Sequence, residues 1–272
     1  MSYKDILLDK KDGVALLTMN RPEKMNTFND NMREEIFRAI IEIEEDPAIR
    51  ATVVTGAGRA YCAGADLSAG AEKFTATGRK RAESPWVPES KTKFFFSLNK
   101  PIIAAINGPA AGVGVTMPLL FDIRLAGESA RLGFVFNRRG LLPEYNSVWV
   151  LSRLIGTSQA AELLYTGRVI GAEEALRFGL VNRVLPDDEL VPAALELAGE
   201  IARKAAPVST ALTKRMLFSY FYNDDVDGCE AETDRLFKWA RDQPDAREGI
   251  AAFLEKRPPR WTMNVPEDMP DF

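Results

Sequence analysis

Short apolar runs that end at glycine or proline alternate with stretches of helical periodicity, and this alternation limits the possible folds more than any other feature. The apolar runs predict strands, and they cover residues 14–19, 51–55, 101–106, 121–126 and 179–184. Isoleucines at helical spacing predict a helix over residues 30–45, and a short helix over 172–178 is expected to stop at Gly179. Because residues 101–106 are almost entirely apolar, we expect this strand to be buried on both faces. The pattern predicts an α/β core.

The strands end at about residue 187, and helical periodicity continues alone. Four helices are predicted from this periodicity and from the breaks at Pro207, residues 223–225 and Pro244; they cover residues 188–205, 207–222, 228–243 and 246–256. Residues 257–272 contain four prolines and little periodicity, so we expect an extended arm that packs on another surface. The chain is therefore divided into a core over residues 1–187 and a helical region over residues 188–272.

The chain of 272 residues contains no histidine, and this absence restricts its chemistry. Ser–His–Asp and Cys–His catalysis, histidine general bases and histidine metal sites are excluded. Carboxylates, backbone amides, hydroxyls and lysines remain as the groups that can carry a reaction.

Charge and composition exclude further classes of protein. With 35 basic and 39 acidic residues, the net charge of −4 argues against a nucleic-acid partner. No apolar run approaches the roughly 18 residues that a membrane span needs, and the N-terminus lacks a signal-peptide pattern. Two cysteines, Cys62 and Cys229, are too few for a disulfide scaffold and fit a reducing compartment. We therefore expect a cytoplasmic protein that does not bind membranes.

Two glycine-rich turns follow predicted strands, at residues 58–67 and 107–115. Neither contains a G-x-G-x-x-G or G-x-x-x-x-G-K fingerprint for phosphate. Such turns leave backbone N–H groups free at the start of a helix. Two N–H groups that converge on one point would form an oxyanion hole, which stabilises a thioester enolate without a charged side chain. Glycines that only permit tight strand-to-helix packing give the same pattern, so the spacing leaves both interpretations open.

Several segments in order resemble the crotonase superfamily of enoyl-CoA hydratases and isomerases. They are NRPEKMN at 20–26, YCAGADL at 61–67, AING at 105–108 with the glycines that follow, and YTGR, AEEA and GLVN between 165 and 182. The similarity is collinear from roughly residue 5 to residue 257. It implies a crotonase-like spiral of β-β-α units. It also implies a C-terminal helical region that builds homotrimers, often paired as a dimer of trimers.

The resemblance also implies the ligand and its contacts. The ligand would be an acyl-CoA thioester, with its thioester oxygen held by the backbone N–H groups of Ala63 and Val113. Residues that match the family's contacts with pantetheine and adenine are Lys24, Met25, Ala65 and Asp66. A C-terminal Phe-x-x-Lys, here Phe253 and Lys256, typically reaches the CoA of a neighbouring subunit. CoA enters with the substrate, so the resemblance implies no separate cofactor and no metal.

The catalytic acid departs from the hydratase pattern. Hydratases of the superfamily use two glutamates, and this chain has Thr116 and Phe136 at those positions. Glu144 follows Pro143, in a loop or the first turn of a predicted helix. An acid there can simply complement a helix dipole, but its position resembles the single catalytic glutamate of the Δ3,Δ2-enoyl-CoA isomerases.

One carboxylate suits isomerisation, because one base can take a proton from C2 and return it at C4 when the oxyanion is stabilised. We therefore predict enoyl-CoA double-bond isomerisation with Glu144 as the proton shuttle. Enoyl-CoA hydratase activity and a non-catalytic acyl-CoA binder remain the alternatives.

Residues 68–98 match no useful pattern. Their aromatic residues, Trp86 and those at 94–96, could line an acyl pocket or pack in the core. The basic run at 79–81 could meet CoA phosphates or form a solvated face.

Overall fold

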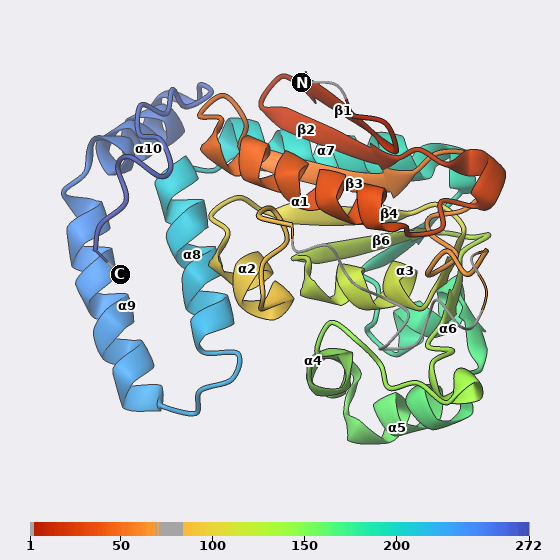
Figure 1. Ribbon diagram of the computed structural model, residues 1–272. Coiled ribbons are helices and arrows are strands. Elements are labelled where there is room, and N and C mark those ends of the chain that lie inside the picture. The colour runs from red at the N-terminus through yellow and green to blue at the C-terminus, as the bar shows by residue number, and fades with distance from the viewer. Residues whose placement is uncertain (1–2, 69, 71–83, 272) are drawn as a thin grey trace.

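The computed structural model describes residues 3–68, 70 and 84–271 (Figure 1). Within these residues the main sheet has the strand order β1-β2-β3-β4-β6-β9. Its strands are β1 (Ile6–Lys11), β2 (Val14–Met19), β3 (Ala51–Gly56), β4 (Ile102–Ile106), β6 (Ile123–Gly127) and β9 (Arg183–Leu185). β1 pairs with β2 in antiparallel fashion, and every later pair is parallel. Parallel neighbours place the ends of β3 and β4, where the two glycine-rich turns begin, at the same edge of the sheet.

Helices cover both faces of this sheet, as Figure 1 shows for α1 (Asp30–Glu45) and α7 (Asp187–Lys204). Ile103 and Ala105 pack with small residues of α7, whereas Ala104 and Ile106 belong to the cluster that includes α1. The prediction of a strand buried on both faces is confirmed, since every residue of β4 is buried. α7 follows the last strand in sequence, but it packs on the sheet and is therefore part of the core.

A second, three-stranded sheet lies next to the first. It consists of β5 (Pro109–Ala111), β7 (Arg131–Gly133) and β8 (Val169–Gly171). The helices between the strands include α2 (Lys91–Ser97), α3 (Val113–Thr116), α4 (Ser147–Ile155), α5 (Thr157–Thr166) and α6 (Ala172–Arg177). α3 continues as a 3-10 helix over Met117–Leu120, because Pro118 cannot donate to the α-helical ladder. Further 3-10 turns cover Pro22–Lys24 and Asn137–Arg139.

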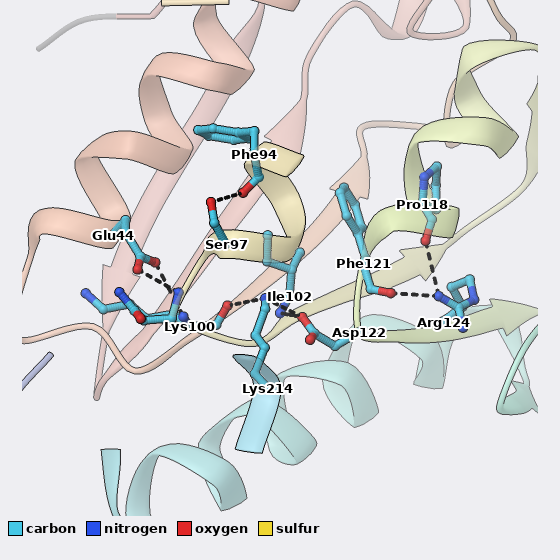
Figure 2. A network of polar contacts seen from close by, with 11 residues as sticks. Glu44, Phe94, Ser97, Lys100, Ile102, Pro118, Phe121, Asp122, Arg124 and Lys214 are labelled. Carbon is cyan, nitrogen blue, oxygen red and sulfur yellow. Dashed lines mark hydrogen bonds and ion pairs between the residues drawn. The ribbon is translucent and has the colours of Figure 1, made fainter. Parts of the chain in front are cut away.

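Two predicted strands begin later than expected, and one buried arginine explains why. β6 starts at Ile123 rather than 121, and β9 starts at Arg183 rather than 179. The guanidinium of Arg124 donates to the carbonyl of Phe121 at 2.8 Å (Figure 2). It also donates to the carbonyl of Leu180 at 2.9 Å, so these two peptide groups face the arginine. Burial lowers the pKa of Arg124 to about 10.

The C-terminal region is helical, as predicted. Its helices α8 (Pro207–Ser219), α9 (Val226–Arg241) and α10 (Pro244–Glu255) stand to one side of the core (Figure 1). The tail packs on the chain's own helices, because Met263 and Val265 are buried in a cluster with residues of α8 and α9. No helix in the described ranges has the length and apolar character needed to cross a membrane.

A buried polar network fastens α8 to the sheet (Figure 2). The ammonium of Lys214 donates to the carboxylate of Asp122 and to the carbonyl of Lys100, each at 2.8 Å. The same carboxylate oxygen of Asp122 accepts from the backbone N–H of Ile102 at 2.7 Å. Asp122 is therefore a structural residue, in agreement with the interpretation of the sequence.

Candidate active site

The two glycine-rich turns lie against each other, backbone to backbone. Ala111 donates its N–H to the carbonyl of Cys62 at 3.0 Å, and Cys62 donates to the carbonyl of Pro109 at 3.2 Å. A Cβ placed on Gly112 would stand 3.7 Å from the Cα of Gly64. The close packing expected of these glycines is thus present. It brings the peptide groups that follow Gly64 and Gly112 to the same place.

The structure corrects one residue of the predicted oxyanion hole. Ala63 donates its N–H to the carbonyl of Met25 at 3.0 Å, so this amide is engaged within the protein and is not open to a ligand. Ala65 forms a bridge with Phe28 in which the neighbouring peptide groups, not its own N–H, make the hydrogen bonds. Within the described residues, the N–H groups of Ala65 and Val113 make no hydrogen bond. These two are therefore the open donors next to the paired glycines.

A clamp formed by Arg21 holds the loop that contains Lys24 and Met25 against this turn. Its guanidinium donates to the carboxylate of Asp66 at 2.8 Å and to the carbonyl of Thr27 at 2.5 Å. The side chains of Arg21 and Asp66 are 9% and 14% exposed. Arg21 was not among the predicted site residues, although it lies in the turn-forming Asn-Arg-Pro at the start of the motif NRPEKMN.

Asn26 fixes the same loop from the inside. Its side-chain amide donates to the carbonyl of Ala60 at 2.7 Å and to that of Ala57 at 2.9 Å, while its oxygen accepts from the N–H of Arg21 at 2.8 Å. Asn26 is fully buried and has a left-handed backbone, as does Met25. The loop therefore has one defined position relative to the turn at Gly64.

Asp66 is an ionised anchor with a lysine nearby. Hydrogen bonds from Ser68 and from Arg21 lower the pKa of Asp66 far below its usual range. The ammonium of Lys24 lies 3.9 Å from the same carboxylate, and the Lys24 side chain remains 49% exposed. The structure thus brings Lys24, Met25, Ala65 and Asp66 together beside the open N–H groups.

Glu144 lies in the loop before α4, as the sequence predicted, and its side chain is half-buried. Burial raises the pKa of the Cys62 thiol to about 12, and the negative charge of Glu144 adds to the same rise, so this carboxylate acts electrostatically on the first glycine-rich turn. Tyr145 and Asn146, which follow it, both have left-handed backbones with φ of 56° and 52°. Such conformations are unfavourable for residues other than glycine, and they define the path of this loop.

The two hydratase positions carry no carboxylate. Thr116 is fully buried at the end of α3, and its hydroxyl has no hydrogen-bond partner among the described residues. The buried ring of Phe136 lies beside the turn, 3.9 Å from where a Cβ on Gly112 would stand. Of these two described positions, one therefore presents a hydroxyl and the other an apolar ring.

Other predicted residues lie elsewhere. Phe253 and Lys256 belong to the end of α10, across the molecule from the glycine-rich turns (Figure 1), and Phe253 is 82% exposed. Phe95 is a core residue. Cys62 is fully buried, as expected of a small packed residue. The basic run at 79–81 lies outside the described residues.

Comparisons with known proteins all point to one family. The family described as enoyl-CoA hydratase/isomerase matches residues 9–264. The chain is 35% identical to the 1,2-epoxyphenylacetyl-CoA isomerase of Escherichia coli (strain K12), over 94% of this chain and 98% of that protein. It is 36% identical to a short-chain-enoyl-CoA hydratase of Clostridium acetobutylicum, over 94% and 97% of the two chains. A crystal structure of a probable enoyl-CoA hydratase/isomerase from Mycobacterium abscessus superposes with a TM-score of 0.87 at 39% identity, covering 94% of this chain and 98% of that one.

Proposed function

The chain belongs to the enoyl-CoA hydratase/isomerase family of enzymes, and on this premise we propose that it moves the double bond of an enoyl-CoA thioester from C3 to C2. Glu144 is the proton carrier of this reaction. The single observation that supports the proposal most is that neither hydratase position carries a carboxylate, while the charge of Glu144 acts on Cys62 in the first glycine-rich turn.

The thioester oxygen is held by the N–H groups of Ala65 and Val113. Both are backbone donors with no hydrogen bond inside the described protein, next to glycines that let a ligand approach closely. Their fixed dipoles stabilise the negative charge that develops on this oxygen when C2 loses a proton, and removal of one such donor typically costs about 10²- to 10³-fold in kcat.

One carboxylate completes the reaction. Glu144 takes a proton from C2, the electrons delocalise from C2 to C4 and onto the thioester oxygen, and the protonated acid then returns the proton at C4. The C3–C4 double bond becomes a C2–C3 double bond, and no water or redox partner is consumed. The apolar wall at Phe136 favours this outcome, because it excludes water from the dienolate.

CoA lies along the loop that contains Lys24 and Met25, with Asp66 and Ala65 beneath it. We include a second copy of the chain in this proposal, with its Phe253 and Lys256 completing the site, as in a homotrimer or a dimer of trimers. Support comes from α10, whose end carries exposed apolar side chains at Ile250, Phe253 and Leu254. Such a patch is typical of a surface that associates with another chain.

Hydration is the second candidate function, and the names of the relatives favour it, since several are called enoyl-CoA hydratases. In this alternative Glu144 activates a water molecule that adds at C3. The lone buried hydroxyl of Thr116 would be the nearest polar group at the hydratase positions.

Separate incubation with 3-enoyl-CoA and 2-enoyl-CoA distinguishes the two reactions, because only hydration yields a 3-hydroxyacyl product. We expect 2-enoyl-CoA to form from 3-enoyl-CoA, and Glu144→Gln to lower kcat by at least about 10²-fold with little change in acyl-CoA affinity. Glu173→Gln, an exposed glutamate of α6, is the matched control and should keep full activity. Full isomerase activity in Glu144→Gln, or 3-hydroxyacyl-CoA as the main product, would refute the proposal.

A further inference from the structure

A cavity of about 770 Å³ lies between α2, the start of α4 and α8. Four aromatic side chains from these helices and from the turn after α8 are part of its lining: Phe96, Trp149, Phe218 and Tyr222. A volume of this size lies within the range that is typical of small-molecule sites. The cavity can therefore hold a group much larger than the end of a short alkyl chain.

The aromatic rings at this cavity hold one another in fixed orientations. Phe96 of α2 stacks on Phe218 of α8, with 4.3 Å between the ring centroids. The ring of Trp149 lies edge to face with that of Phe221, with 5.2 Å between centroids, and the guanidinium of Arg153 lies 4.1 Å from the centre of the Trp149 ring. Side chains that are already fixed lose little freedom when a ligand binds. This part of the lining is therefore a preorganised aromatic surface.

The cavity lies next to the loop that contains Glu144. Asn146 is the residue before α4 and is also part of the cavity lining. Trp149 donates its backbone N–H to the carbonyl of Asn146 at 3.1 Å, so the first turn of α4 joins the aromatic surface to this loop. In the proposed reaction Glu144 exchanges a proton with C2 and C4. The part of the acyl group beyond C4 therefore has this cavity as the adjoining space.

Taking the proposed function as its basis, we propose that this cavity receives the far end of the acyl group and that this end is an aromatic ring. The substrates are then CoA thioesters of unsaturated acids that end in such a ring. Aromatic rings that meet edge to face or in offset stacks attract each other by more than the area they bury. A planar ring also loses fewer rotatable bonds on binding than an alkyl chain with the same number of carbons. Trp149 determines this specificity, because it connects the aromatic surface to the loop of Glu144.

Binding of saturated thioesters tests this proposal without any turnover. The dissociation constant of a phenyl-ended acyl-CoA is measured by calorimetry on the whole chain, for a series of linker lengths between the thioester and the ring. The same measurement is made with the cyclohexyl-ended thioester of equal linker and with the straight-chain thioester of equal carbon number. We expect the phenyl-ended thioester to bind at least about threefold more tightly than its cyclohexyl counterpart at the best length. A cavity that is only apolar would give the opposite order, because the cyclohexyl end has more apolar surface to bury.

Variants locate the effect. Trp149→Leu should lower the ratio of the cyclohexyl to the phenyl dissociation constant at least about twofold, whereas Trp149→Phe keeps a ring at this position and should change the ratio little. Tyr222 is 61% exposed, so Tyr222→Leu serves as a second test if Trp149→Leu fails to fold, and it should lower the same ratio. Tyr165→Leu removes an exposed ring of α5 that is outside the described lining and should leave the ratio unchanged.

Equal affinity for the phenyl and cyclohexyl ends at every length would overturn the proposal. Tighter binding of the cyclohexyl or straight-chain thioester would also overturn it, as would a preference that survives in both Trp149→Leu and Tyr222→Leu. The result is independent of Glu144, because saturated thioesters do not react. A protein that prefers the phenyl-ended thioester but isomerises no 3-enoyl-CoA would refute the proposed function alone. Isomerisation with no such preference would refute only the assignment of the cavity.

Discussion

The ion pair between Arg21 and Asp66 connects the loop that contains Lys24 and Met25 to the turn that presents the Ala65 amide, and its removal should destabilise both. In Arg21→Met the carboxylate of Asp66 loses a 2.8 Å charged hydrogen bond, and the carbonyl of Thr27 loses its donor. Both side chains of the pair are largely buried, so water replaces these contacts only in part.

The expected size of the effect follows from what remains around Asp66. Breaking a buried ion pair by removing one partner costs about 3–5 kcal/mol of unfolding free energy. Asp66 keeps a hydrogen bond from the N–H of Ser68 and has the Lys24 ammonium at 3.9 Å, so its charge stays partly compensated. We therefore expect a loss of about 2–3 kcal/mol for Arg21→Met and a similar loss for Asp66→Asn. The double variant should lose less than the sum, with a coupling of about 1–2 kcal/mol.

Urea unfolding of the wild type, the two single variants and the double variant measures this coupling. The pH dependence supplies a second check on Asp66. Its pKa is lowered on folding, first by Ser68 and then by Arg21, so the stability that its charge confers is fully present above its unfolded pKa of about 3.9. This contribution is lost as the pH falls toward the folded-state value. The difference between wild type and Asp66→Asn should thus shrink below about pH 4. Additive single losses, or a difference that grows in acid, would refute the reasoning.

Two further substitutions test the turn and the network. Gly64→Ala should lower kcat by about 10²-fold, because the backbone has φ of 103° and a Cβ would stand 3.0 Å from the carbonyl oxygen of Ala111, which displaces the next amide. Gly140→Ala has a positive φ but open space around it, and steady-state kinetics should show activity near wild type. Lys214→Met should lower the free energy of unfolding by about 3 kcal/mol, because the side chain is 4% exposed and leaves a buried carboxylate behind. Lys204→Met, an exposed helical lysine, should change the urea midpoint little, and equal losses in the two lysine variants would contradict this account.

Much of the fold follows from the hydrophobic pattern of the sequence. The crotonase-like α/β fold is confirmed by the structural neighbours and by the mostly parallel sheet. Strands buried on both faces, such as β4, have a strong signal because every residue must be apolar. β1 was missed because it is an edge strand in which half of the residues are charged and most are exposed, so no buried face marks it. The three-residue strands of the second sheet are too short to show any period.

Sequence motifs predicted which turns form the candidate site. They did not predict which backbone amides and side chains form hydrogen bonds within it. The motif YCAGADL gave the correct turn, but only the bond from Ala63 to Met25 shows which of its amides is engaged. Arg21 lies in the motif NRPEKMN, but the motif does not reveal its pairing with Asp66, which spans 45 residues of sequence and depends on the loop between them. The position of Glu144 after Pro143 predicted the loop in which it lies, whereas its catalytic role follows from the family resemblance and stays a prediction. Its approach to Cys62 depends on tertiary packing.

The paired left-handed residues Tyr145 and Asn146 have a consequence for engineering. A non-glycine residue in this conformation costs about 1–3 kcal/mol, and two in succession persist only because the surrounding structure holds them. Glycine at either position would remove that cost, and it would also let the backbone beside Glu144 adopt more conformations. A substitution that raises thermal stability at this bend would therefore loosen the position of Glu144. Stabilising substitutions should be sought elsewhere in the chain.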